Sequence, residues 1–297
     1  MTGLGALIKR NCKLFFKDKG MFFTSLITPV ILLVLYATFL AKVYKDSFVS
    51  ALSAGVSVDE ALINGTVGGQ LISSLLAVCC VTVAFCSNLL MVQDRISGAR
   101  RDLTMSPVKR STLALSYFAA SALSTLLICY AALAACLGYL YFTGWYLSAA
   151  DVLLLCLDVL ILVLFGMALS SIINCNLTTN GQASAVGTIV SSGYGFICGA
   201  YMPISSFGTG LQKVLSFLPG TYGTALFRNH ALNGVYEEMA RQGFPAEAVE
   251  AIRDSIDCNL YFFGEKVSIG AMYGVMGASV ALLIGGYILL NLRKKKN

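Results

Sequence analysis

The sequence TVGGQLISSLLAVCCVTVAFCSNLLMV, residues 66–92, contains no charged side chain and no histidine. A helix of roughly 20 predominantly apolar residues crosses a lipid bilayer, so this stretch is long enough to span it. The same character extends along the chain of 297 residues, of which 57% are hydrophobic and only 12% are charged. A soluble domain carries about 25% charged residues. We therefore expect an all-α integral membrane protein.

Five further apolar runs have the length of a membrane span. The six predicted spans are residues 22–41, 66–92, 112–142, 152–173, 182–202 and 267–292. Of the 21 Lys and Arg residues, 14 fall in the connections on one side of these spans and 7 in those on the other. The positive-inside rule then predicts that both termini are cytoplasmic, which agrees with an even number of spans.

Residues 1–20 are predicted to form an amphipathic helix on the inner leaflet. Leu7, Ile8 and Phe15 fall on one helical face, whereas Lys9 and Lys13 fall on the opposite face. A basic amphipathic helix of this kind anchors a protein at the membrane surface. The same helix is also placed to transmit motion, and the two roles are compatible.

Residues 93–113, QDRISGARRDLTMSPVKRSTL, are the most charged of the predicted cytoplasmic connections. We expect a short helix over residues 94–105 that ends at Ser106, because the residue before a proline is disfavoured in the helical conformation. An apolar ridge of Ile96, Ala99 and Leu103 with a charged rim suits docking into a groove of a partner protein. On composition alone, a basic loop that merely fixes the topology is the simpler interpretation.

Two features inside the predicted spans are candidates for a functional site. The fifth span is rich in Gly and Ser; close helix packing is the commoner use of such residues, and lining a cavity is the alternative for Thr188, Ser191 and Tyr194. In the fourth span, Asp158 is a carboxylate inside the membrane, which is costly and marks a functional candidate. The simpler alternative is an outer-leaflet carboxylate that is hydrogen-bonded to a neighbour or to water.

The predicted outer segment, residues 203–266, begins with an apolar part that is too short to span. We expect a re-entrant or interfacial helix pair there, bounded by Pro203 and Pro219. Residues 236–257 are amphipathic and charged, and they predict a small folded cap outside the membrane, with Pro245 in the first turn of a helix.

Several kinds of site are not indicated by the sequence. No G-x-x-x-x-G-K-[ST] motif occurs, so the chain is expected to hold no P-loop. His230 is the only histidine, and a lone histidine does not make a zinc site. The basic residues form short clusters beside apolar runs rather than a groove-binding face. We therefore expect no enzyme activity, metal site, bound cofactor or nucleic-acid partner.

Three features together resemble the type-2 permease family of ABC transporters, the membrane subunits of bacterial exporters. The first is the six-span plan with its basic amphipathic amino-terminal helix. The second is the series Asp94-Arg95, Gly98, Leu103 and Ser106-Pro107-Val108, which is similar to the family's acidic-Arg, Gly, Leu, Ser-Pro-Val pattern. The third is the proline-punctuated segment after the fifth span, with Gly199, Pro203, Leu218-Pro219 and Tyr222. The outer segment 229–266 is longer than the minimal family pattern.

The resemblance implies a fold, partners and site residues. Residues 1–20 would be the connecting helix, and the segment after the second span would be the coupling helix that seats on a separate ATPase subunit. That ATPase, in two copies, would bind ATP and magnesium, and a second permease copy, identical or homologous, would complete a path lined by the second and fifth spans. The implied coupling residues are Asp94, Arg95, Ile96, Gly98, Ala99, Arg100, Arg101, Asp102, Leu103, Ser106 and Pro107, and the implied path residues are Phe85, Asn88, Thr188, Ser191 and Tyr194.

The leading hypothesis is an exporter subunit in a bacterial cell membrane that moves a drug, antimicrobial peptide, lipid or glycan outward. A self-sufficient secondary transporter or channel is one alternative, although it predicts several ionisable residues in the spans and the sequence places only Asp158 there. An immunity or sensor protein that does not transport is the other alternative.

Overall fold

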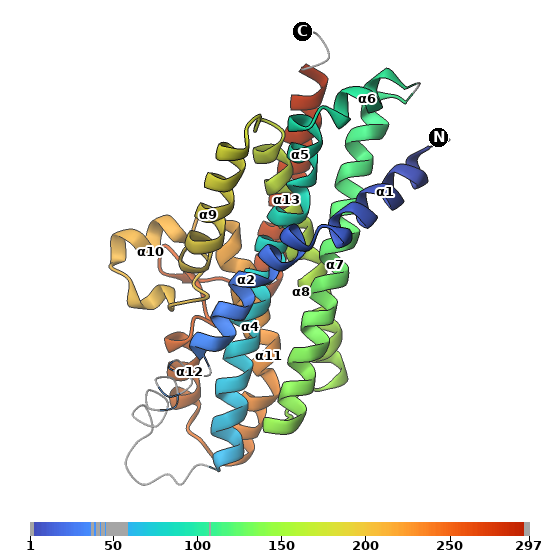
Figure 1. Cartoon of the computed structure of the whole chain (residues 1–297). Coiled ribbons are helices and arrows are strands. Elements are labelled where there is room, and N and C mark those ends of the chain that lie inside the picture. The colour runs from blue at the N-terminus through green and yellow to red at the C-terminus, as the bar shows by residue number, and fades with distance from the viewer. Residues whose placement is uncertain are drawn as a thin grey trace.

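The computed structural model describes residues 3–36, 59–106 and 108–293, together with the single residues 39, 42 and 45. The described chain is a bundle of long helices with one short antiparallel hairpin (Figure 1). In chain order the helices are α1 (Leu4–Lys17), α2 (Lys19–Leu35), α4 (Glu60–Asn88), α5 (Leu90–Ile96), α6 (Ala99–Met105), α7 (Arg110–Thr143), α8 (Ala149–Asn174), α9 (Asn180–Ile197), α10 (Thr209–Leu215), α11 (Pro219–Arg241), α12 (Ala246–Ser255) and α13 (Ile269–Arg293). The hairpin pairs β1 (Tyr261–Phe262) with β2 (Glu265–Lys266), and a 3-10 turn covers Ile204–Ser206.

Four of these stretches are long and apolar enough to cross a membrane, namely Glu60–Ile96, α7, α8 and Ile269–Leu290. The helices α1 and α2 meet at an angle of 71°, and they make a fifth candidate if the bent pair is counted as one span. The 18 residues of α9 do not belong to this set. The structure thus confirms an all-α membrane protein, while the six-span plan stays a prediction. Residues 37, 38, 40 and 41 of the predicted first span lie outside the described residues.

The side chains on the surface of the long helices are those expected of a lipid-facing protein. Leu127 on α7, Leu153 on α8 and Leu282 on α13 are 61%, 70% and 77% exposed. Exposed Phe142 lies in the last turn of α7 and exposed Trp145 just after it, and aromatic side chains at such a position are typical of a membrane interface. Three helices match the predicted spans to within three residues at either end: α7, α8 and α13.

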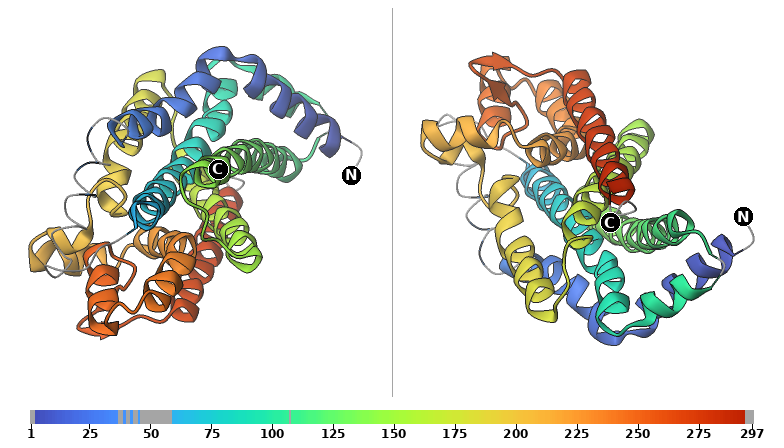
Figure 2. Two further views of the ribbon diagram at one scale, coloured as in Figure 1. Left: turned by 90° about the horizontal axis from the view of Figure 1, so that it is seen from below. Right: turned by 90° about the horizontal axis from the view of Figure 1, so that it is seen from above.

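Helix α4 forms the centre of the bundle and contacts α2, α7, α8, α9 and α11 (Figure 2). Its residues from Thr66 to Asn88 are all buried, which explains why this stretch is apolar on every face. A Cβ atom at Gly166 of α8 would lie 3.1 Å from the Cα atom of Val81, so the two helices approach closely there. The helix begins at Glu60, earlier than the predicted second span, because the Asp59 side chain accepts a hydrogen bond from the backbone N–H of Ala61 at 3.2 Å.

The predicted outer segment differs from its expected structure. Helix α9 ends at Ile197, before the predicted limit of the fifth span, because Gly199 adopts a left-handed conformation with φ +74°. The short helix α10 follows the turn and projects to the side of the bundle (Figure 1). Pro219 then starts α11, which packs against α4, α8 and α13. The expected surface segment therefore contains a buried core helix. Of the predicted cap, residues 236–257, the first residues belong to the end of α11 and the rest contain α12, with Pro245 immediately before it. The hairpin follows the predicted cap in the sequence.

Candidate functional site

The helix predicted over residues 94–105 is broken in two. Gly98 has φ +84°, a left-handed conformation that an α-helix cannot contain, so α5 ends at Ile96 and α6 begins at Ala99. Helix α5 continues the line of the central helix α4, whereas α6 leaves it at the end of the bundle where α1 begins and α13 ends (Figure 1). The predicted coupling residues are consequently divided between a buried segment and an exposed one.

Asp94 lies in the buried segment and joins three helices. Its carboxylate forms an ion pair with Arg10 of α1, with the Nη1–Oδ2 distance at 2.7 Å, and accepts a hydrogen bond from the Tyr117 hydroxyl of α7 at 2.6 Å. Asp94 and Tyr117 are both buried, and charge-assisted hydrogen bonds of this length are among the stronger ones. Asp94 thus links α5 directly to the amphipathic helix α1 and to α7.

Arg95 joins the same segment to the turn between α8 and α9. Its guanidinium group donates hydrogen bonds to the backbone oxygen of Cys175 at 2.9 Å and to that of Leu177. These carbonyl groups follow the last turn of α8, where a cation also interacts favourably with the helix dipole. Asp94 and Arg95, in the helix α5 that precedes α6, therefore connect α5 to α1 and α7 and to the turn between α8 and α9. We call this end of α5 the base of α6.

Helix α6 has no buried residue and presents Arg101, Asp102 and Thr104 to solvent. Met105 is 84% exposed and is the most exposed apolar side chain near the break.

The apolar ridge predicted from Ile96, Ala99 and Leu103 is wrong in one respect, because Leu103 is half-buried and packs against the core of the bundle. Ile96 lies before the break, Arg100 is half-buried, and Ser106 donates a hydrogen bond to the Leu103 oxygen at 2.6 Å. Pro107 lies outside the described residues.

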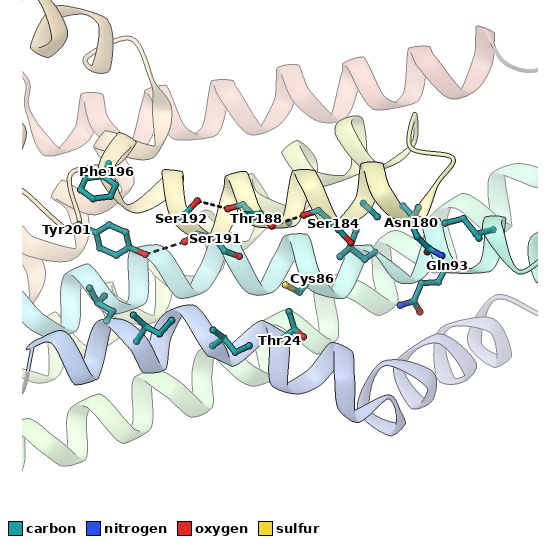
Figure 3. A pocket seen from close by; sticks show the side chains of 18 of the residues that line it. Thr24, Cys86, Gln93, Asn180, Ser184, Thr188, Ser191, Ser192, Phe196 and Tyr201 are labelled. Carbon is teal, nitrogen blue, oxygen red and sulfur yellow. Dashed lines mark hydrogen bonds between the residues drawn. The ribbon is translucent and has the colours of Figure 1, made fainter.

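A cavity of about 830 Å³ lies between α2, the α4–α5 stretch and α9 (Figure 3). Thr188 and Ser191 of α9, two of the predicted path residues, line it, while the path between two permease copies stays a prediction. Gln93 and Asn180 lie at one end of the cavity, and Phe196 and Tyr201 lie at the other. Its volume is within the range of about 300–1,000 Å³ that is usual for small-molecule sites.

The other three predicted path residues do not line this cavity. Asn88 points to α8, where its amide donates hydrogen bonds to Ser170 and Ser171, both at 3.0 Å. Phe85 is buried in the core, and Tyr194 packs against Gly220 of α11. The face of α4 and α5 that lines the cavity carries Cys86 and Gln93 instead. Cys86 follows Phe85 directly and is therefore rotated from it by about 100° around the helix.

The sequence of residues 2–231 matches the model of a protein family described as ABC-2 type transporter. This match covers well over half of the chain. The chain belongs to the ABC-2 type transporter family. It is therefore an ABC permease subunit, a membrane transport component that is not itself catalytic, as the resemblance implied. No individual curated protein matches the sequence.

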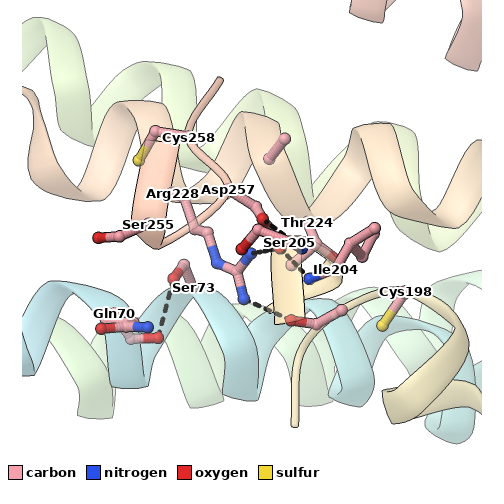
Figure 4. A network of polar contacts seen from close by, with 12 residues as sticks. Gln70, Ser73, Cys198, Ile204, Ser205, Thr224, Arg228, Ser255, Asp257 and Cys258 are labelled. Atoms are coloured by element: carbon pink, nitrogen blue, oxygen red, sulfur yellow. Dashed lines mark hydrogen bonds and ion pairs between the residues drawn. The ribbon is translucent and has the colours of Figure 1, made fainter. Parts of the chain in front are cut away.

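This permease also contains a buried ion pair that sequence analysis missed. Arg228 of α11 lies 3.3 Å from Asp257, and both side chains are almost fully buried (Figure 4). Arg228 also donates to the Gly199 oxygen, while Asp257 accepts from the backbone N–H groups of Ile204 and Ser205. The pair holds together the turn after α9, the buried helix α11 and the end of the segment that contains α12.

A second buried network includes the intramembrane carboxylate that the sequence singled out. Asp158 of α8 lies 2.6 Å from the Nδ1 atom of His230 and accepts a hydrogen bond from the Tyr273 hydroxyl of α13, also at 2.6 Å. The His230 and Tyr273 rings are stacked at 6.1 Å. The permease thus satisfies Asp158 through neighbours, which agrees with the simpler of the two predicted alternatives. Within the described ranges, no group of three or more His, Cys, Asp and Glu side chains is arranged to hold a metal ion.

Proposed function

We propose that this permease is the membrane subunit of an ATP-driven exporter, with ATP and magnesium bound by a separate ATPase subunit. The assembly comprises two permease copies, identical or homologous, and two ATPase subunits. It moves a drug, antimicrobial peptide, lipid or glycan outward through a bacterial cell membrane. Both chain termini and α6 lie in the cytoplasm in this proposal.

The observation that carries the proposal is the position of α6. The helix lies at one end of the bundle with a charged and solvent-exposed surface, and its base is tied through Asp94 to α1 and α7. Arg95 ties the same base to the turn before α9, which lines the cavity. A partner that moves α6 would therefore act on the helices around the cavity, which is what coupling of ATP hydrolysis to transport requires.

The structure changes which side chain is the best anchor for the ATPase. Leu103 packs against the bundle, so Leu103→Asp would disturb the permease itself as well as docking. Met105 is the better choice because it is 84% exposed. Removing an apolar anchor from an interface costs about 1–2 kcal/mol or more, which is about a tenfold loss of affinity.

The test is co-purification of the permease with a candidate ATPase, followed by ATP hydrolysis in liposomes. We expect Met105→Asp to weaken association at least about tenfold without lowering the amount of permease in the membrane. Thr104→Asp is the matched control at the neighbouring exposed position, on the rim of the docking surface. Normal association and normal hydrolysis in Met105→Asp would show that α6 is only a topological determinant.

A further inference from the structure

The cavity between α2, the α4–α5 stretch and α9 has an unusual chemical lining. Among its described residues there is no Asp, Glu, Lys, Arg or His. Arg95, which is close in sequence to Gln93, directs its guanidinium group to the carbonyls of Cys175 and Leu177 instead. A ligand held here finds no opposite charge, and burying an unpaired charge is far more costly than burying an apolar group.

The hydroxyl groups of the lining act mainly as hydrogen-bond acceptors. Thr24, Thr188 and Ser192 each donate their hydrogen to a backbone oxygen of their own helix, at 2.6, 3.0 and 2.6 Å. The Tyr201 hydroxyl donates to the Ser191 oxygen at 3.4 Å. A hydroxyl oxygen keeps lone pairs after donating its hydrogen, so a ligand with O–H or N–H groups is complementary to this surface.

The two amide side chains of the lining, for which the described part of the chain offers no partner, lie at the same end of the cavity. The amides of Gln93 and Asn180 lie there, whereas the opposite end carries the aromatic rings of Phe196 and Tyr201 (Figure 3). Ile27 and Ile31 of α2 form the apolar wall between the two ends. The cavity is thus amphipathic along its length.

We propose that this cavity binds an uncharged amphiphile, with its hydrogen-bonding head at Gln93 and Asn180 and its apolar body along α2 and the aromatic end. The proposal rests on the proposed function, because it names the substrate class of the exporter. The volume of about 830 Å³ admits one lipophilic molecule of drug or small-lipid size. The described lining offers no opposite charge to a permanently cationic or anionic molecule, so we expect such a molecule to bind more weakly.

The experiment measures binding to the purified permease in nanodiscs, without ATP and without an ATPase. Three fluorescent probes carry a dansyl group on the same alkyl chain and end in a hydroxyl, a trimethylammonium or a sulfonate group. Binding to empty nanodiscs is subtracted for each probe. We expect the hydroxyl probe to bind saturably, at least about tenfold more tightly than either charged probe.

Two substitutions at one position make the test specific. Thr188→Asp places a carboxylate in the cavity, so the hydroxyl probe should bind about tenfold more weakly and the trimethylammonium probe should become the preferred ligand. Thr188→Val removes only the hydroxyl and should weaken binding of the hydroxyl probe about 2- to 10-fold. Ser279→Asp is the matched control, since Ser279 of α13 donates to the oxygen of the residue four positions earlier but does not line the cavity. This control should leave all three affinities unchanged.

Equal affinities for the three probes, or binding that neither substitution at Thr188 alters, would overturn the proposal. So would efficient disulfide formation between two copies of Thr188→Cys with loss of probe binding, because a second permease copy would then fill the cavity. Native mass spectrometry provides a third test. If it shows a bound anionic phospholipid that the hydroxyl probe does not displace, the proposal is overturned as well. Each of these results leaves co-purification with the ATPase intact, so failure of this inference is distinct from failure of the proposed function.

Discussion

Replacing Arg228 by methionine is expected to be among the most destabilising single substitutions in this permease. The Arg228 side chain is 1% exposed and the Asp257 side chain is 5% exposed, so the change leaves a buried carboxylate without its counter-ion. Removing one partner of a buried pair costs about 3–5 kcal/mol. Asp257 keeps two backbone N–H donors, from Ile204 and Ser205, which places the expected loss near the lower limit, at about 3 kcal/mol.

The same helix supplies a matched control. Arg241 of α11 also forms an ion pair, with Glu238 at 3.6 Å, but its side chain is 75% exposed. An exposed pair contributes only about 0–1 kcal/mol, so Arg241→Met should be close to wild type. The measurement is the free energy of unfolding in mixed micelles titrated with sodium dodecyl sulfate, with the amount of folded protein followed by circular dichroism.

A double-mutant cycle separates the ion pair from general packing. Arg228→Met and Asp257→Asn should each be destabilising, because each leaves the other group buried and unpaired. The double variant should recover at least about 2 kcal/mol relative to the sum of the two single changes. If the two losses were additive, or if Arg228→Met fell within about 0.5 kcal/mol of Arg241→Met, the ion pair would not be what holds together the turn after α9, α11 and the end of the segment that contains α12.

Three further predictions follow from other contacts. Asp94→Asn should lower the free energy of unfolding by about 1–3 kcal/mol and uncouple ATP hydrolysis from transport, because Arg10 and Tyr117 lose a charged partner. Asp102→Asn, at the exposed surface of α6, should do neither. Equal effects of the two substitutions would contradict the role of the Asp94 network. His230→Phe should destabilise the permease, because among the described residues it leaves Asp158 with Tyr273 as its only side-chain partner. Adding Asp158→Asn to the same chain should restore part of the lost stability. If His230→Phe left the free energy of unfolding unchanged in the same titration, this prediction would be refuted. The cysteine introduced by Glu247→Cys should react with a membrane-impermeant maleimide in intact cells. Cys258 should add no background, because burial raises the pKa of its thiol to about 11 and the protonated thiol is unreactive. Reaction only after permeabilisation would reverse the proposed topology.

The sequence predicted the long spanning helices well because lipid imposes a simple constraint on them. Helices α7, α8 and α13 are uninterrupted apolar runs, and every backbone group in the bilayer must be paired within its own helix. The break at Gly98 was not predicted, since a glycine inside a short charged segment is compatible with either a helix or a turn. The sequence also did not indicate that the cavity is lined by Cys86 rather than by Phe85 or Asn88, because α4 is buried on all sides and its hydrophobic pattern singles out no face.

The buried position of α11 shows most clearly what composition alone cannot predict. Between Lys213 and Glu237, Arg228 and His230 are the only acidic or basic side chains in the sequence. Such residues normally indicate a solvent-exposed segment. Their partners, Asp257 and Asp158, are 29 and 72 residues away in the sequence, so nothing local indicates that the charges are compensated. The one available signal was the scarcity of charge after Pro219, in a stretch that continues for 23 helical residues. An ionisable side chain in such a stretch indicates that a partner from another part of the chain compensates it. Arg228 and His230 lie on nearly opposite faces of α11, so their contacts with Asp257 and Asp158 fix both the rotation of the helix and its position along its axis.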